Sequence, residues 1–337
     1  MRKYILIYIL FLGSIYCHGQ SDNIEPFKIL KGHLHKINGI SYNKTGNLLA
    51  SGAWDNTVRI WDMNTFTVKH VLIGHEDNVW GAKFSPDDKF LISGSMDASM
   101  IIWEVETGKL IKRITVEPKD IIMKGMIPEL DHKFPNSLGP GAFMDDGNTL
   151  LTGSTDGLIR ILDMNSFTFI DTLFGHKGPV NNIVLSDNGK FLASGSWKNE
   201  LIIWDLESLK ILHYLKTKQH SAYSLKFMNN DKYLFSAGGS LIKIWDIESE
   251  TIIKTFEGQK GMQQCKFSPD GKYLASCAED HTVWLRNFET GEIVWKYRGP
   301  KLEISTLDFS PDGKYLAVGT PESDILIWKL DDLTRNK

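Results

Sequence analysis

The chain has 337 residues, of which 42% are hydrophobic and 23% charged, so it is long enough for one large core or several small ones. Its formal net charge of −3 shows no excess of basic residues. We therefore expect no nucleic-acid partner.

The N-terminal residues follow the pattern of a secretory signal peptide. Arg2 and Lys3 precede an apolar run at residues 4–16, which is too short to cross a bilayer comfortably. Small and polar residues follow, in the style of a bacterial signal. We predict that residues 1–19 are a signal peptide, cleaved after Gly19.

Cleavage would leave residues 20–337 as a mature domain with no membrane span, in a secreted or periplasmic location. It would also remove two cations and take the formal net charge to −5. Two alternatives remain open. One is lipid attachment at Cys17, which the bulky Tyr16 before it disfavours, and the other is a retained N-terminal anchor.

A phrase of twelve residues recurs along the rest of the chain. SGAWDNTVRIWD at 51–62 returns as SGSMDASMIIWE at 93–104 and SGSWKNELIIWD at 194–205, with looser copies between and after them. The residues at the penultimate position are Trp61, Trp103, Leu162, Trp204, Trp245, Arg286 and Trp328. Their spacings of 42, 59, 42, 41, 41 and 42 predict seven repeats, one of them with an insertion.

Each copy lies in the same local pattern. FSPDDKFLISG at 84–94 is typical of two strands joined by a tight turn, and the recurring phrase supplies a second turn and a third strand. A polar turn then leads to a fourth strand, such as VKHVLIGH at 68–75. Four short strands at a period near 42 predict one blade of a β-propeller.

Gly-His before the first strand, Asp in the middle turn and Trp-Asp at the end of the third strand resemble WD-repeat proteins. The resemblance covers residues 25–330. It implies an all-β, seven-bladed propeller of four-stranded antiparallel blades. The last repeat lacks its outer strand, and residues 27–30 match that strand. We therefore expect the N-terminal strand to complete the last blade and close the ring, which is how WD-repeat propellers, the family this chain resembles, are closed.

The resemblance also implies a hydrogen-bond network of His, Ser or Thr, Asp and Trp inside a blade. Its members here are His33, Ser51, Asp55 and Trp61; His75, Ser93, Asp97 and Trp103; and His176, Ser194 and Trp204. In this last set Lys198 stands where Asp is expected, and the remaining repeats lack one or more members. Because the set recurs from repeat to repeat, we interpret it as structural rather than catalytic.

WD-repeat proteins commonly bind partners on the rim formed by the loops before the first strand and between the second and third strands. The candidates at these positions are Trp54, Trp80, Met96, Trp197, Tyr223, Asn38 and Asn181. Trp54, Trp80 and Met96 are expected to form one cluster, and Trp197 and Tyr223 another. The alternative is that these side chains pack under neighbouring loops.

Two further features leave alternatives open. An insertion at about 115–140 is expected on the same rim. It either packs over the central channel or its neighbours, or forms a flexible loop. Cys265 and Cys277 lie on consecutive predicted strands of one hairpin. We expect two buried free thiols, although a cross-strand disulfide is conceivable in an exported protein.

No catalytic motif stands out. There is no nucleophile elbow and no metal-ligand spacing, and the acids Asp131, Glu279 and Glu303 have no partner that the sequence can identify. We predict no catalytic residue, metal ion or cofactor. The predicted function is a monomeric, non-catalytic scaffold that binds protein partners. A propeller that binds a glycan or small ligand is the alternative, followed by a propeller hydrolase.

Overall fold

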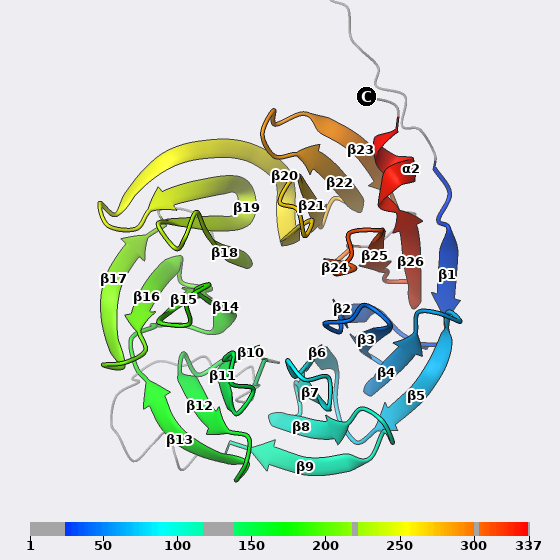
Figure 1. Ribbon diagram of the computed structural model, residues 1–337, viewed down its shortest axis with the longest axis horizontal. Coiled ribbons are helices and arrows are strands. Elements are labelled where there is room, and N and C mark those ends of the chain that lie inside the picture. The colour runs from blue at the N-terminus through cyan, green and yellow to red at the C-terminus, as the bar shows by residue number, and fades with distance from the viewer. Residues whose placement is uncertain (1–23, 117–137, 140, 218–221, 300–302, 336–337) are drawn as a thin grey trace, which may run out of the picture.

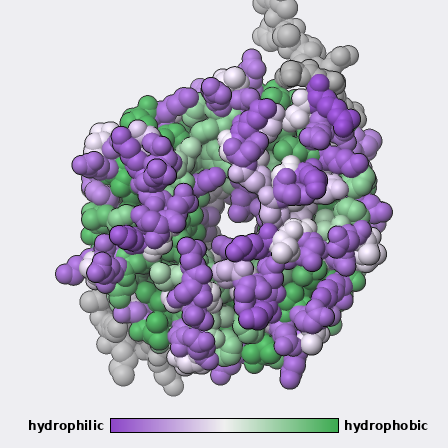
Figure 2. All heavy atoms as spheres, in the orientation of Figure 1, coloured by the Kyte–Doolittle hydropathy of each residue, from purple (hydrophilic) through white to green (hydrophobic). Residues whose placement is uncertain are grey.

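The structure, a computed structural model, describes residues 24–116, 138–139, 141–217, 222–299 and 303–335. Antiparallel sheets stand in a ring (Figure 1), and the space-filling view shows an opening at its centre (Figure 2). The expected signal peptide and nearly all of the expected insertion lie outside the described residues. Within these ranges, no helix combines the length and the apolar character needed to cross a membrane.

Four sheets hold four strands each in simple chain order, with the first strand at the centre of the ring. The first contains β2 (Ile37–Tyr42), β3 (Leu48–Ala53), β4 (Thr57–Asp62) and β5 (Thr67–Ile73). The second contains β6 (Val79–Phe84), β7 (Phe90–Ser95), β8 (Ser99–Glu104) and β9 (Leu110–Thr115). The third contains β10 (Ala142–Phe143), β11 (Thr149–Gly153), β12 (Ile159–Asp163) and β13 (Thr168–Leu173). The fourth contains β14 (Val180–Leu185), β15 (Phe191–Ser196), β16 (Glu200–Asp205) and β17 (Lys210–Lys216).

The next sheet contradicts the prediction of seven blades with four strands each. It has six strands, namely β18 (Ser224–Met228), β19 (Tyr233–Asp246), β20 (Thr251–Phe267), β21 (Tyr273–Ala278), β22 (Thr282–Asn287) and β23 (Ile293–Arg298). The described residues therefore form a six-bladed propeller in which one sheet has six strands, and the prediction of seven blades is wrong.

The cause lies in two long strands that appear as wide arcs in Figure 1. β19 pairs with β18 through its N-terminal part and with β20 from Gly239 onward, and β20 pairs with β19 as far as Met262 and then with β21. The repeat ending at Trp245 lacks the middle-turn Asp, and glycines with φ of 59° and 70° at Gly239 and Gly261 let the strands bend without ending. Hydrogen bonding therefore continues from one repeat into the next.

The ring closes as expected. β1 (Lys28–Lys31) is the outer strand of the last sheet, in the order β1, β26 (Asp324–Lys329), β25 (Tyr315–Gly319) and β24 (Thr306–Phe309). β1 begins one residue later than the expected segment 27–30. The indole N–H of Trp328 donates to the carbonyl of Ile24 at 2.9 Å, which ties the preceding residues to the same sheet.

A short C-terminal helix, α2 (Leu330–Thr334), follows β26 and was not predicted from sequence. Its Leu330 and Leu333 are buried against the aromatic side chains of Trp295 and Trp328. This helix therefore covers the junction between the closing sheet and the six-stranded sheet.

The core is a series of apolar layers between neighbouring sheet faces. One layer joins the β2–β5 and β6–β9 sheets and includes Val58, Val79 and Trp103. Another joins the closing sheet to the β2–β5 sheet and includes Leu30, Ile37 and Ile325. Because each sheet is buried on both faces, its strands are apolar at consecutive positions rather than at alternate ones.

Cys265 and Cys277 are buried free thiols. Cys265 packs with Phe235 and Met262, whereas Cys277 packs in the layer that contains Leu307, so the two side chains point to opposite faces of the sheet. Burial raises the pKa of Cys265 to about 12 and that of Cys277 well above its usual value. Both thiols are therefore poorly reactive.

Candidate partner-binding rim

A chain of hydrogen bonds in the β2–β5 sheet links the tryptophan of β4 to the turn between β3 and β4. The Trp61 indole donates to Ser51 Oγ at 2.8 Å, Ser51 Oγ bonds His33 Nε2 at 2.7 Å, and His33 Nδ1 bonds Asp55 Oδ2 at 2.8 Å. The ionised Asp55 carboxylate can only accept, so the hydrogen of a neutral His33 ring is on Nδ1, and Ser51 donates its hydroxyl hydrogen to Nε2 while accepting from the indole. Burial lowers the pKa of His33, which keeps the ring neutral.

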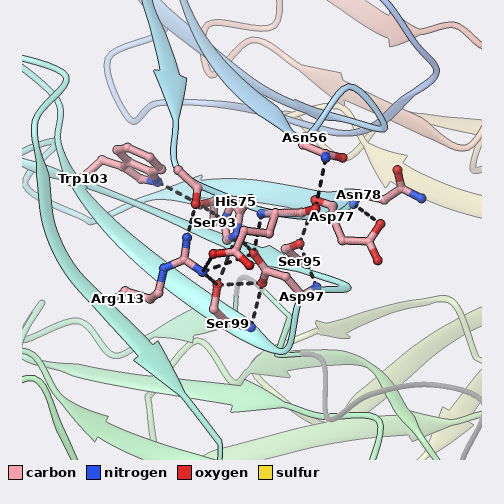
Figure 3. A network of polar contacts seen from close by, with 12 residues as sticks. Asn56, His75, Asp77, Asn78, Ser93, Ser95, Asp97, Ser99, Trp103 and Arg113 are labelled. Atoms are coloured by element: carbon pink, nitrogen blue, oxygen red, sulfur yellow. Dashed lines mark hydrogen bonds and ion pairs between the residues drawn. The ribbon is translucent and has the colours of Figure 1, made fainter.

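The β6–β9 sheet repeats this arrangement, as Figure 3 shows. Trp103 donates to Ser93 at 2.8 Å, Ser93 bonds His75 at 2.8 Å, and His75 bonds Asp97 at 2.9 Å. Arg113 on β9 adds an ion pair to Asp97, with Nη1 to Oδ2 at 3.5 Å. The same residue types at the same spacing therefore build the same geometry twice.

The aspartate in each network fixes the rim turn by accepting several hydrogen bonds. Asp97 accepts the backbone N–H of Glu76 at 2.9 Å and that of Ser99 at 2.8 Å. Burial opposes the charge, but the bonds from His75, Ser99 and Glu76 outweigh it and hold the pKa of Asp97 well below its usual range. The pKa of Asp55 is lowered in the same way.

The Ser-His-Asp order of these networks is similar to a catalytic triad, but the access differs. Ser51 and Ser93 are both 0% exposed, and each hydroxyl oxygen already accepts an indole N–H. A substrate cannot reach these oxygens without unpacking a sheet. Within the ranges that the structure describes, no group of three or more His, Cys, Asp or Glu side chains is placed to hold a metal ion.

The β14–β17 sheet supplies its carboxylate from a position that sequence reasoning missed. His176 Nε2 and the Trp204 indole meet Ser194 Oγ at 2.6 and 2.7 Å, as in the other two networks. Glu200, at the start of β16, accepts the backbone N–H of Lys177 at 2.9 Å and lies 3.4 Å from His176 Nδ1. The carboxylate thus comes from the strand, two residues after Lys198.

Tyr214 on β17 also donates its hydroxyl hydrogen to Glu200. Burial alone would raise the pKa of Glu200, but hydrogen bonds from His176, Tyr214 and Lys177 lower it to about 2. The sequence does contain a sign of this replacement carboxylate. Glu200 stands at the position that Thr57 and Ser99 occupy in the earlier repeats, so an acid replaces a hydroxyl there.

The low pKa of Glu200 predicts a specific loss of stability in acid. The ionised carboxylate stabilises the fold above about pH 4.5, and this contribution is lost as pH falls towards about 2. Glu200→Gln is expected to lower the melting temperature by a few degrees at pH 7, with a difference that shrinks towards pH 2. Thermal melts between pH 7 and pH 2 check this, with exposed Glu207→Gln as control. A difference that does not change with pH would contradict the assignment.

Other repeats replace the network with different partners. In the β10–β13 sheet, Arg160 Nη2 pairs with Asp156 Oδ2 at 2.5 Å, and both side chains are buried. In the six-stranded sheet, Gln259 takes the place of His, bonding Ser276 and also donating to Thr282 Oγ1 at 2.7 Å. These repeats thus keep a buried polar link without the His-Asp pair.

The most exposed apolar side chains of this rim surround the turn that holds Trp54. Trp54 is 42% exposed and Leu34 is 78% exposed, and the backbone N–H of Leu34 donates to Asp55 Oδ2 at 2.9 Å. Lys36 Nζ lies 5.1 Å from the centre of the Trp54 ring and forms an ion pair with Glu303. We call Leu34, Lys36, Trp54 and Glu303 the Trp54 patch.

The Trp54 patch crosses the closure of the ring. Glu303 precedes β24 of the closing sheet, whereas Lys36 and Trp54 belong to the β2–β5 sheet. The backbone N–H of Trp54 donates to the Lys36 carbonyl at 2.9 Å, so the two loops of that sheet are also joined. Sequence reasoning placed Trp54 on this rim but did not include Leu34 or pair Lys36 with Glu303.

The neighbours predicted beside Trp54 are less accessible. Trp80 and Met96 are half-buried. Asn38 Nδ2 donates to the Trp80 carbonyl at 3.3 Å, and Met96 Sδ lies 3.6 Å from Asn78 Nδ2. Asn38 and Trp80 thus join two sheets at the inner edge of the rim.

The residues of the second predicted cluster also differ in how accessible they are to a partner. Trp197 is 38% exposed, and its backbone N–H donates to the Pro179 carbonyl at 3.0 Å. Tyr223 is half-buried, and its carbonyl accepts from Asn182 Nδ2 at 2.9 Å. The amide group of Asn181 is buried and has no hydrogen-bond partner, so it is not presented to a ligand.

Comparison with known protein families agrees with this geometry. The profile described as WD domain, G-beta repeat, matches residues 24–62 and 66–104, and the one described as IFT122 first beta-propeller matches residues 141–337, more than half of the chain. The chain belongs to the WD-repeat family. WD-repeat propellers typically act as protein-interaction scaffolds and are generally non-catalytic.

Three relatives show the extent of the similarity. Cross-pathway control WD-repeat protein 2 of Flammulina velutipes is 31% identical over 271 residues, which cover 80% of this chain and 81% of that protein. Small ribosomal subunit protein RACK1y of Oryza sativa subsp. japonica is 33% identical over 287 residues, covering 81% and 78%. Protein tipD of Dictyostelium discoideum is 26% identical over 286 residues, but the match spans only 44% of its length.

Proposed function

We propose that this WD-repeat protein is a non-catalytic scaffold that binds a protein partner through the Trp54 patch. The observation that carries the proposal is the exposure of Trp54 and Leu34, 42% and 78%, on a turn held rigid by the Asp55 network. An exposed tryptophan on a fixed turn is typical of a binding hot spot, because little side-chain entropy is lost when it is covered.

The charges of the patch indicate the chemistry of the partner. Lys36 and Glu303 neutralise one another, so the patch offers an apolar centre with one cation and one anion beside it. A partner segment that places an apolar side chain on Trp54 and Leu34 would match this arrangement. One relative is named as a protein of the small ribosomal subunit, which supports a role within a larger assembly.

The geometry favours a protein over a glycan. Stacking of a sugar ring needs an open aromatic face, and the Lys36 ammonium group lies only 5.1 Å from the centre of the Trp54 ring. Trp80, the other aromatic candidate of that cluster, is half-buried. We therefore keep glycan binding as an outcome of the test and not as a second proposal.

We also propose that the protein is exported. The support is the basic pair Arg2 and Lys3 before the apolar run at 4–16. Expression in a bacterium followed by N-terminal sequencing of the mature protein tests this proposal. A mature chain that begins at Gln20 would support it, and a chain recovered from the cytoplasm with its first residues intact would contradict it.

Loss of the Trp54 side chain is expected to reduce partner capture strongly without changing the fold. Tagged wild-type, Trp54→Ala and Ile252→Ala proteins are each used to recover partners from the native host, with quantification by mass spectrometry. Ile252 is a matched control, because it is 44% exposed but lies on the outer strand β20. A partner should be lost by about ten-fold or more with Trp54→Ala alone. Equal recovery by all three proteins, or binding of glycans in its place, would contradict the proposal.

A further inference from the structure

A single position on the inner strands carries an unusual set of charges. Lys83 on β6 pairs in register with Ile92, Lys226 on β18 with Phe235, and Lys266 on β20 with Ala275. Asp308 on β24 occupies the same position, opposite Ala317. These four side chains therefore stand at one level of the ring.

The position faces the central channel. Lys83, Lys226 and Lys266 are exposed, whereas the residues on either side of Lys83 and Lys226 are buried between the sheets. The inner strands border the centre of the ring in Figure 1, and Figure 2 shows an opening there, with hydrophilic residues around much of it. Three ammonium groups and one carboxylate thus share a narrow, water-accessible space.

The charges are close enough to influence one another. Partial loss of hydration between the channel walls, followed by the positive charge of Lys266, lowers the pKa of Lys83 to about 8, although Asp308 opposes the shift. Burial also lowers the pKa of Lys226, with Asp187 opposing and Lys266 adding to the effect. Like charges therefore repel across the channel, and the two carboxylates that oppose the shifts, Asp308 and Asp187, do not neutralise three cations.

Most of the donor capacity of these lysines is unused. Lys83 Nζ donates to the carbonyl of Gly141 at 3.3 Å, and Lys226 Nζ lies 4.7 Å from the centre of the Phe267 ring. Lys266 has no hydrogen bond or ion pair with any part of the chain that the structure describes. Asp308 Oδ2 already accepts the backbone N–H of Tyr42 at 2.9 Å. Each ammonium group carries three donors, so several remain available in the channel.

We propose that the central channel binds a small phosphate-bearing anion between Lys83, Lys226 and Lys266. A phosphate group offers several acceptor oxygens on one compact centre, which suits donors that converge from three strands. Its charge would relieve the repulsion between the lysines. This site lies inside the ring, separate from the Trp54 patch on the rim.

Calorimetric titration of the purified protein with pyrophosphate and with inorganic phosphate, at about 0.15 M salt, tests the proposal. Wild-type protein is expected to bind pyrophosphate with one site per chain. Lys266→Gln and, independently, Lys226→Gln are expected to weaken binding by about ten-fold or more. Lys112→Gln, which removes an exposed lysine of the outer strand β9, is the matched control and should leave binding unchanged.

Three results would overturn the proposal. They are an absence of heat with wild-type protein for both phosphate probes, an equal weakening by Lys112→Gln, and binding of citrate as tight as that of pyrophosphate. The second would indicate attraction to the overall charge, and the third a site without phosphate preference. The substituted side chains are exposed, so each variant is expected to fold. Melting curves of the variants check this.

Discussion

Leu30→Ala is expected to lower the free energy of unfolding by about 3 kcal/mol, and the melting temperature by about 6 °C or more. Leu30 is 1% exposed and packs with Ile37, Ile325 and Ile327 in the layer that joins the two ends of the ring. Removal of its side chain leaves a cavity at β1, the strand through which the described N-terminal residues join the closing sheet.

The effect at Leu30 is expected to exceed that of an ordinary core truncation because of its place in the ring. β1 pairs with β26 over four residues, and no strand in the described ranges pairs with its other edge. If β1 detaches, the Trp328 indole also loses the carbonyl of Ile24, and a buried donor is left unpaired. The closing sheet would then keep only its three inner strands.

Ile29→Ala is the matched control for the closure. Ile29 is the preceding residue of the same strand and is 43% exposed, so its truncation is expected to change the melting temperature by at most about 2 °C. Chemical denaturation and thermal melts of both variants measure the difference. Equal losses in the two variants, or no loss in Leu30→Ala, would show that β1 does not hold the ring closed.

Arg160→Met is expected to destabilise the fold by about 3–5 kcal/mol, because it leaves the buried Asp156 carboxylate without its counter-ion. Asp156 is 1% exposed and Arg160 is 5% exposed, and their side chains meet in two contacts of 2.5 and 3.3 Å. The only other donor to the carboxylate among the described contacts is the backbone N–H of Leu158, at 3.0 Å.

A double variant separates this charge effect from the loss of packing. Asp156→Asn combined with Arg160→Met removes the unpaired charge but keeps an acceptor for Leu158, and should recover part of the stability. Arg298→Met, at an exposed position on β23, is the control for replacement of an arginine on a strand. Urea unfolding of the four proteins gives the result. A double variant that is as unstable as Arg160→Met would refute the charge explanation.

The sequence predicted the parts of the fold that repeat. The tryptophan recurs at one position of the third strand because its indole must reach a serine on the second strand, as it does at Trp61, Trp103 and Trp204. Spacing alone could not show that two repeats share one sheet. That outcome depends on hydrogen bonds between β19 and β20, which continue where Gly239 and Gly261 replace ordinary turns.

The site was less accessible to sequence reasoning than the fold. The exposed position of Trp54 followed from its place just before the network Asp55, but its partners did not. Lys36 and Glu303 are far apart in the chain and meet only because the ring closes. Glu200 was missed for a different reason, since its carboxylate reaches His176 from a strand position where the earlier repeats have a hydroxyl.

The most direct test of the proposed scaffold function is site-specific photo-crosslinking with benzoylphenylalanine in place of Leu34 or Ile73. The two side chains are equally accessible, 78% and 77% exposed, but Leu34 lies in the Trp54 patch and Ile73 on the outer strand β5. Crosslinks to one distinct protein from position 34, and none from position 73, are the predicted result. Crosslinks from position 73 alone, or equally from both positions, would contradict binding through the Trp54 patch.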